Sequence, residues 1–193
     1  DELLAFAQRH DLWIITDEVY DRIVFDNEHV SFVGSDNERV ILINSFSKTY
    51  AMTGWRIGYI MSANKEAMNQ MTKLQYYITA CSNDAMQYAV LAAINEADDY
   101  PDEMCAEFKA RRDLICSRLN AMPGVQCHIP EGAFYVFPKV EVTGMSSEEV
   151  AIELLKGGVL CSPGSAFGPS GEGHLRFAYT ISRDDISLGM DKT

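Results

Sequence analysis

The sequence lacks the features that mark a membrane protein, a disulfide-rich scaffold or a zinc site. Its five cysteines are scattered through the chain and form no C-x-x-C pair. An odd, unpaired set argues against a disulfide framework and indicates a reducing, cytoplasmic setting. No apolar run approaches the length of a membrane span, and the N-terminus has no basic-then-apolar signal.

Positive charge is also scarce. The 193 residues include 16 Lys and Arg against 28 Asp and Glu, a formal net charge of −12. A nucleic-acid backbone or an anionic membrane surface would repel such a chain, so we expect neither as a partner. An acidic total still permits an anionic cofactor, because a few arginines and backbone amides can make a local positive site.

The apolar pattern of the first half predicts an α/β fold. Apolar runs that predict buried strands are found at 12–16, 40–46 and 57–61. Helical spacing of apolar residues is found at 1–10, 64–78 and 83–96. Short apolar strands separated by helical stretches predict a sheet that is covered on both faces.

The second half has a different character. A polar break near 98–102 predicts a domain boundary, with one domain over 1–98 and another over 99–193. A helix is expected after Pro101, a favourable first-turn residue, and another after Ser146, which forms a capping-box pattern with Glu149. Ser182 is expected to cap a last short helix. The strands predicted here are 125–129, 133–137, 159–162 and 174–180.

Polar side chains follow several of these runs, at the strand ends where α/β proteins bind ligands. Taken singly, each has an ordinary explanation. Asp17 would make a turn or a cap, Tyr20 would be a half-buried aromatic, and Lys48 would be solvated. Arg56 and Arg176 would be ion-pair partners.

The ordered combination is more specific. The segments, in chain order, are "DEVY" (17–20), "NSFSKTYAMTGWRIGY" (44–59), "PEGAFYVFP" (130–138), "SPGSAFG" (162–168) and "HLRFAYT" (174–180). Over essentially its whole length the chain resembles the C-terminal half of a class I/II aminotransferase, the aspartate-aminotransferase-like enzymes of pyridoxal 5'-phosphate (PLP) fold type I. The resemblance implies part of a large-domain sheet with flanking helices, followed by a small C-terminal α/β domain.

The resemblance also implies the role of each site residue. Lys48 would be the Schiff-base anchor of PLP and then the proton shuttle. Asp17 would keep the pyridine nitrogen protonated, and Tyr20 would bind the 3-oxygen of the ring. The implied phosphate ligands are Ser45, Ser47 and Arg56. Arg176 would clamp the substrate carboxylate through bidentate hydrogen bonds.

The two glycine-containing segments of the second half, 132–134 and 164–167, either pack the small domain or shape its side of the pocket. Members of this family are about twice as long as this chain, and their sites lie at a homodimer interface. We therefore expect further chain before Asp1, carrying the phosphate-cradling turn and the aromatic that stacks on PLP. The closing helix is shorter than the family pattern implies.

Three functions agree with these residues. The first is an aminotransferase that exchanges an amino group between an amino acid and a 2-oxo acid. The second is a PLP-dependent lyase, either a C–S β-lyase or an aminocyclopropane-carboxylate synthase-like enzyme, which would use the same residues. The third is a non-catalytic fragment of the same fold. The substrate is left open, although the absence of a second arginine near 79–84 disfavours an acidic side chain.

Overall fold

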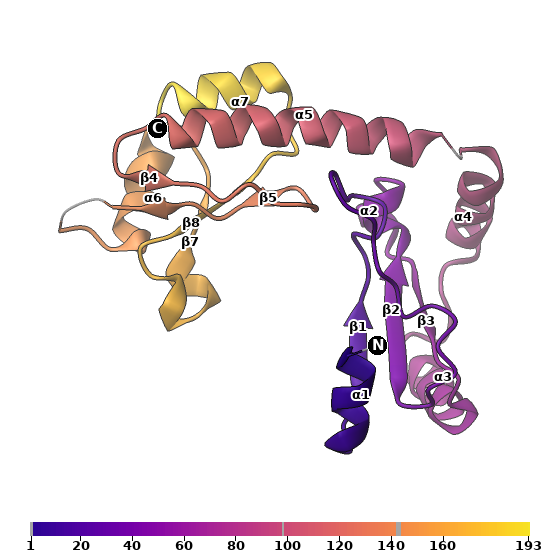
Figure 1. Ribbon diagram of the computed structural model, residues 1–193. Helices are drawn as coiled ribbons and strands as arrows, with labels where there is room; N and C mark the ends of the chain where they lie inside the picture. The colour runs from indigo at the N-terminus through magenta and orange to yellow at the C-terminus, as the bar shows by residue number, and fades with distance from the viewer. Residues whose placement is uncertain (1, 98, 142–143) are drawn as a thin grey trace. The chain divides into compact units, whose positions relative to one another are not determined.

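The computed structural model describes residues 2–97, 99–141 and 144–193 and divides the chain into two compact units (Figure 1). Unit 1 comprises the residues up to Arg22 together with Glu28–Asp102. Unit 2 comprises Ile23–Asn27 together with Glu103–Thr193. The division after Asp102 falls at the end of the predicted boundary region, 98–102. Residue 98 of that region lies outside the described residues. The assignment of domains over 1–98 and 99–193 stays a prediction.

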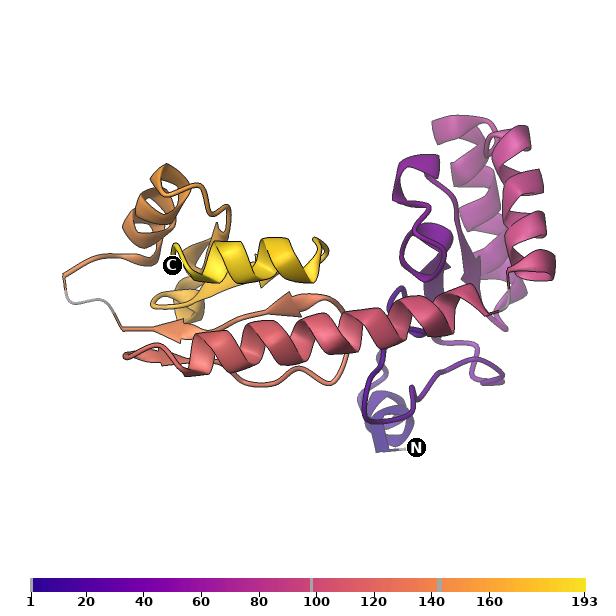
Figure 2. The same ribbon diagram turned by 90° about the horizontal axis from the view of Figure 1, so that it is seen from above.

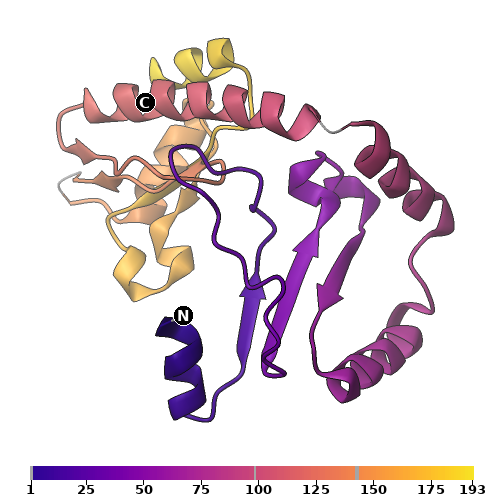
Figure 3. The same ribbon diagram turned by 45° about the vertical axis from the view of Figure 1, so that its right-hand side comes forward.

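Unit 1 is built on a three-stranded mixed sheet with the order β1-β2-β3 (Figure 3). Strand β1 (Ile14–Asp17) runs parallel to β2 (Val40–Ser45), and β3 (Gly58–Met61) runs antiparallel to β2. All three strands coincide with predicted apolar runs, whose β-branched residues favour extended backbone. The helices of this unit are α1 (Glu2–Arg9), α2 (Phe46–Thr49), α3 (Lys65–Thr79) and α4 (Asp84–Glu96), with a 3-10 turn at Thr53–Trp55.

The two faces of this sheet differ in burial. Along β2, Val40, Leu42 and Asn44 are buried and alternate with half-buried neighbours. On β1, Ile15 is 67% exposed, and every residue of β3 is exposed. The prediction of a sheet covered on both faces is therefore wrong for this chain, because its helices leave part of the sheet open.

Helices α3 and α4 begin at asparagine caps. The side chain of Asn64 accepts from the Ala67 amide at 2.8 Å, and that of Asn83 from the Met86 amide at 3.3 Å. Such caps satisfy backbone amides that have no partner inside the helix. The apolar faces predicted for these helices are mostly exposed, since Val90 is the one buried residue among the described side chains of the two.

Unit 2 combines a long helix with short strands. Helix α5 (Tyr100–Asn120) begins in unit 1 and has Pro101 in its first turn, as predicted. Strands β4 (Val125–Gln126) and β6 (Lys139–Val140) pair antiparallel. Strand β8 (Leu175–Ala178) lies between β5 (Tyr135–Val136) and β7 (Ser162–Pro163). The remaining elements are α6 (Ser147–Lys156), α7 (Arg183–Met190) and 3-10 turns at Gly164–Phe167 and Pro169–Gly171.

Helix α7 lies alongside α5 and runs in the same direction (Figures 1 and 2). Arg183 at its start pairs with Glu107, and Asp191 just after its end pairs with Arg118. The buried apolar side chains of this unit include Ile115, Leu119, Leu175, Phe177, Tyr179 and Ile186.

The two predicted helix starts of this unit are confirmed. At Ser146 the backbone N–H donates to Glu149 at 2.8 Å while the serine hydroxyl accepts from the Glu149 amide, which completes the capping box. Ser182 accepts from the Asp185 amide at 3.1 Å at the start of α7. None of the described helices is long and apolar enough to cross a membrane.

The five residues Ile23–Asn27 join unit 2 although they precede β2 in the sequence. Val24 makes a β-bridge with Gly132. Asp26 accepts a hydrogen bond from Arg112, which is 4% exposed, and a second one from Lys109 at 2.7 Å. A buried guanidinium needs such partners, because its charge cannot be lost by deprotonation.

Candidate active site

Lys48 lies in the single helical turn α2, directly after the end of β2. Ser45 closes the strand with extended backbone and caps the turn, since its hydroxyl accepts from the Ser47 amide at 3.4 Å. The Nζ atom of Lys48 lies 5.7 Å from the centre of the Tyr20 ring. The structure therefore brings together two of the predicted site residues that are 28 positions apart in the sequence.

Asp17 and Tyr20 lie at the carboxyl end of the neighbouring strand. Asp17 is the last residue of β1 and is in register with Ile43 of β2, two residues before Ser45. Its carboxylate accepts from the Val19 amide at 3.3 Å, which makes the local turn expected of a strand-end aspartate. Because β1 and β2 are parallel, both segments that follow them emerge at the same edge of the sheet.

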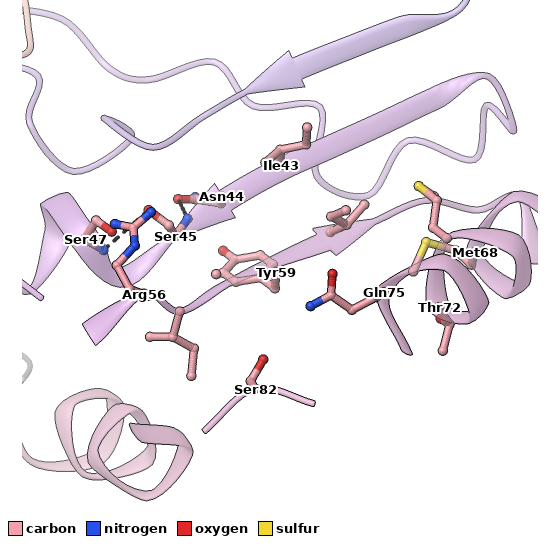
Figure 4. Close-up of a pocket in the computed structure, with 14 residues that line it drawn as sticks. Ile43, Asn44, Ser45, Ser47, Arg56, Tyr59, Met68, Thr72, Gln75 and Ser82 are labelled. Carbon is pink, nitrogen blue, oxygen red and sulfur yellow. Dashed lines mark hydrogen bonds between the residues drawn. The ribbon is translucent and has the colours of Figure 1, made fainter. Parts of the chain in front are cut away.

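Arg56 follows the 3-10 turn at Thr53–Trp55 and precedes β3, the strand that pairs with β2 on the side opposite β1. Its Nη1 donates to the Thr53 carbonyl at 2.8 Å, and the Thr53 hydroxyl donates to the Ser47 carbonyl at 2.9 Å. Arg56 has left-handed backbone, with φ 54°. In Figure 4 its guanidinium lies beside Ser45 and Ser47.

Ser45, Ser47 and Arg56 line one end of an open pocket of about 560 Å³. The other lining residues that Figure 4 labels are Ile43, Asn44, Tyr59, Met68, Thr72, Gln75 and Ser82. A guanidinium has five N–H donors, so Arg56 can bind an anion while keeping its bond to Thr53. Two hydroxyls, a backbone amide at a helix start and one arginine form a donor set that fits a phosphate group.

Glu18, which the sequence analysis did not single out, lies between Asp17 and Val19 and is 5% exposed. Its carboxylate accepts from Ser31 at 2.5 Å, from His29 Nε2 at 2.9 Å and from the Phe32 amide at 3.0 Å. Burial by itself raises the pKa of Glu18, but these hydrogen bonds outweigh burial, and the pKa is lowered overall. Glu18 thereby holds the loop that contains residues 29–32 against the end of β1.

Asp21 was also missed. It accepts from the side chains of Asn44 at 2.9 Å and Thr49 at 3.3 Å, and so connects the segment after β1 with the segment after β2. Sequence signals existed for this contact, since Asn44 and Thr49 flank "SFSK" and Asp21 follows "DEVY". Their pairing was not visible, because nothing local relates positions 23 residues apart.

Arg176 belongs to unit 2, where it lies on β8 and contacts two aromatic rings. Its guanidinium carbon lies 4.7 Å from the centre of Tyr135 and 4.5 Å from that of Phe167. Stacking on ring faces leaves the N–H groups in the plane of the guanidinium, where a carboxylate binds. Phe167 ends the predicted 164–167 segment, and Phe134 of the 132–134 segment is buried against Phe108. The 132–134 segment is thus shown to pack within unit 2, through Phe134.

Comparison with known proteins identifies the family of this chain. The profile of the aminotransferase class I and II family matches residues 1–192. The chain is 44% identical to a probable aspartate aminotransferase of Methanocaldococcus jannaschii, over 98% of this chain and 52% of that protein. It is 38% identical to aromatic-amino-acid aminotransferase 2 of Thermococcus litoralis, over 100% of this chain and 50% of that protein.

Solved structures lead to the same family. The structure of an aromatic aminotransferase from Pyrococcus horikoshii matches with a TM-score of 0.92 at 38% identity, over 99% of this chain and 52% of that one. The chain therefore belongs to the class I and II aminotransferases, which are PLP-dependent enzymes of fold type I. It spans about half the length of the relatives it matches. That it corresponds to their C-terminal half stays a prediction, based on the Lys48 motif.

Proposed function

We propose that the protein containing this chain is a PLP-dependent aminotransferase that exchanges an amino group between an amino acid and a 2-oxo acid. The observation that carries the proposal is the position of Lys48, 5.7 Å from the Tyr20 ring at the edge where β1 and β2 end. An amine, a phenol and a carboxylate beside an anion-binding donor set match the functional groups of PLP, namely an aldehyde, a ring oxygen, a ring nitrogen and a phosphate.

Each residue has a defined role in this proposal. Ser45, Ser47 and Arg56 bind the phosphate through hydroxyls and guanidinium N–H groups. Lys48 attaches the cofactor through its amine and then carries a proton to and from the substrate α-carbon. When bound, PLP supplies an electron sink that stabilises negative charge at that carbon.

Asp17 and Tyr20 tune the ring, in this proposal. The Asp17 carboxylate keeps a proton on the ring nitrogen, and the Tyr20 hydroxyl donates to the ring oxygen. Arg176 binds the substrate α-carboxylate in this proposal, and its contacts with the Tyr135 and Phe167 rings limit where its guanidinium can lie.

The setting of the enzyme is part of the same proposal. We infer a cytoplasmic homodimer of amino acid metabolism, with 1–98 in the PLP-binding large domain and 99–193 in the small domain. The relatives are named for aspartate and for aromatic amino acids, so family membership does not select the substrate.

The test is to add PLP to the purified protein, reduce with borohydride and map the labelled peptide. We expect a single stable label on Lys48, and loss of the label in Lys48→Ala. Lys73→Ala is the matched control, since Lys73 is an exposed lysine on α3 of the same unit. A label spread over exposed lysines, or one that survives Lys48→Ala, would refute the proposed attachment site.

A second measurement separates transfer from elimination. Incubation with an amino acid and a 2-oxo acid should convert the 2-oxo acid into its amino acid. Release of pyruvate and ammonia without any acceptor would instead indicate a lyase.

A further inference from the structure

Tyr20 and Lys48 follow two different strands, and the sheet alone does not set the distance between their side chains. The β1–β2 register ends at Asp17 and Ile43, so Tyr20 lies three positions and Lys48 five positions beyond the last paired residue of its strand. Lys48 lies in a helix of only four residues, and Ala51 after it has a strained positive φ of 53°. A single helical turn is not stable by itself, so tertiary contacts must hold it.

Asp21 supplies such contacts. One carboxylate oxygen accepts from Asn44 Nδ2 at 2.9 Å, and the other accepts from the Thr49 hydroxyl at 3.3 Å. Asn44 is 5% and Thr49 is 9% exposed, so water cannot readily replace Asp21 as their partner. The other end of the Asn44 amide accepts from the Ser45 backbone at 2.7 Å, which fixes the side chain on both sides.

The residues that form these hydrogen bonds are sequence neighbours of Tyr20 and Lys48. Asp21 directly follows Tyr20, and Thr49 directly follows Lys48. A bond between positions 21 and 49 therefore restricts how far positions 20 and 48 can separate. In addition, the Asp21 amide donates to the Glu18 carbonyl at 3.0 Å, so the turn that contains Tyr20 is itself closed.

We propose that Asp21 is a positioning residue, which sets the spacing between Tyr20 and Lys48 through its hydrogen bonds to Asn44 and Thr49. This inference rests on the proposed function, because the spacing matters to chemistry only when PLP is attached to Lys48. Asp21 touches neither substrate nor cofactor in this proposal and acts through its neighbours.

The experiment compares Asp21→Asn with the double variant that also carries Asn44→Asp. Asp21→Asn turns one of the two carboxylate oxygens into an NH2 group at almost constant volume, so only one of Asn44 and Thr49 can still donate to position 21. In the double variant, the NH2 group at position 21 can donate to the carboxylate at position 44, and the oxygen at position 21 can still accept from Thr49. The carboxylate at position 44 can also still accept from the Ser45 amide. Asp11→Asn is the control, since Asp11 is a strongly exposed aspartate of the same unit.

Three readouts follow, of which one needs no cofactor. The first is the pH midpoint of the visible absorbance change of bound PLP, which depends on groups near the attached amine. The second is kcat and KM for amino transfer. The third is hydrogen exchange of the amides of residues 46–52 without PLP, which reports the stability of the α2 turn.

In Asp21→Asn we expect the midpoint to move by about 0.5 pH unit or more. We expect kcat to fall about 10- to 100-fold with little change in KM, because a small misplacement of reacting groups slows the chemical step. Exchange of residues 46–52 should become faster. The double variant should recover most of all three properties, and Asp11→Asn should match the unchanged protein.

The failures of the two proposals can be told apart. If the unchanged protein forms no borohydride-stable PLP label on Lys48, the proposed function fails and this inference fails with it. If the label forms but Asp21→Asn leaves the midpoint and kcat unchanged, the inference alone is overturned. Faster exchange with an unchanged midpoint would also overturn it, because Asp21 would then have a structural role only.

Discussion

Replacement of Glu18 measures how much its contacts with the loop over residues 29–32 contribute to the free energy of unfolding. The Glu18 carboxylate accepts from His29, Ser31 and the Phe32 amide, and the Thr16 hydroxyl contacts it at 3.2 Å. Hydrogen bonds to a charged group contribute about 1.5–3 kcal/mol each, and donors that find new partners recover much of that amount. Ser31 can rotate its hydroxyl and His29 is partly exposed, whereas the Phe32 amide has a fixed direction.

The expected free-energy change follows from those contacts. Glu18→Ala removes every acceptor, and we expect it to lower the free energy of unfolding by about 3 kcal/mol. Glu18→Gln keeps one oxygen for the Phe32 amide and offers an NH2 group to Ser31 and His29, so the loss should be about 1 kcal/mol. With a urea m value of about 2 kcal/mol/M, the Glu18→Ala midpoint should fall by about 1.5 M.

Tryptophan fluorescence during urea unfolding is a suitable assay, because both tryptophans, Trp13 and Trp55, belong to unit 1. Glu28→Ala and Glu28→Gln are the matched controls, since Glu28 is an exposed glutamate in the same loop. A Glu18→Ala midpoint that moves no further than the Glu28→Ala midpoint would refute the role given to Glu18.

The same pair of variants should show a pH dependence with a definite sign. The pKa of Glu18 is lowered on folding, so its contribution to stability is complete above the ordinary value of 4.5 and is lost as the pH falls through the lowered pKa. The stability advantage of the unchanged protein over Glu18→Gln should therefore be full at neutral pH and shrink only below about pH 4.5. An advantage that grew on acidification would contradict this assignment.

Two further predictions concern unit 2. Asn120→Ala should lower the free energy of unfolding by about 1.5 kcal/mol in urea titrations followed by circular dichroism, since it removes bonds of 2.9 and 2.8 Å to the Cys127 backbone. Gly164→Ala should cost about 2–4 kcal/mol in the same assay, because its Cβ would lie 2.0 Å from the Gly171 carbonyl oxygen. Gly189→Ala, with open space at its Cβ, is the control and should not destabilise α7.

Much of the fold could be predicted because the relevant signals are local. The three strands of unit 1 coincide with apolar runs, and the capping box of Ser146 and Glu149 needs only residues three positions apart. Burial was harder to predict. The apolar spacing of 64–78 indicated a helix correctly, yet α3 has no buried residue, because burial depends on which other elements cover a face.

For the site, the motif around Lys48 selected residues that the structure places at one edge of a sheet. Asp17, Tyr20, Ser45, Ser47 and Lys48 all lie at the ends of β1 and β2. The residues that hold them were not selected, since Glu18 reaches Phe32 across 14 positions and Asp21 reaches Asn44 across 23. Such pairs have no periodicity or spacing rule that sequence reasoning could use.

The sequence by itself determined the family, the type and order of the main elements, and the chemical groups available to bind PLP. Tertiary structure decided which of those groups lie close together and what keeps them there. The physical reason is the range of the interactions. Helix caps and apolar periodicity depend on neighbours within a few residues, whereas the contacts of Asp21 with Asn44 and Thr49 exist only after β1 and β2 have paired.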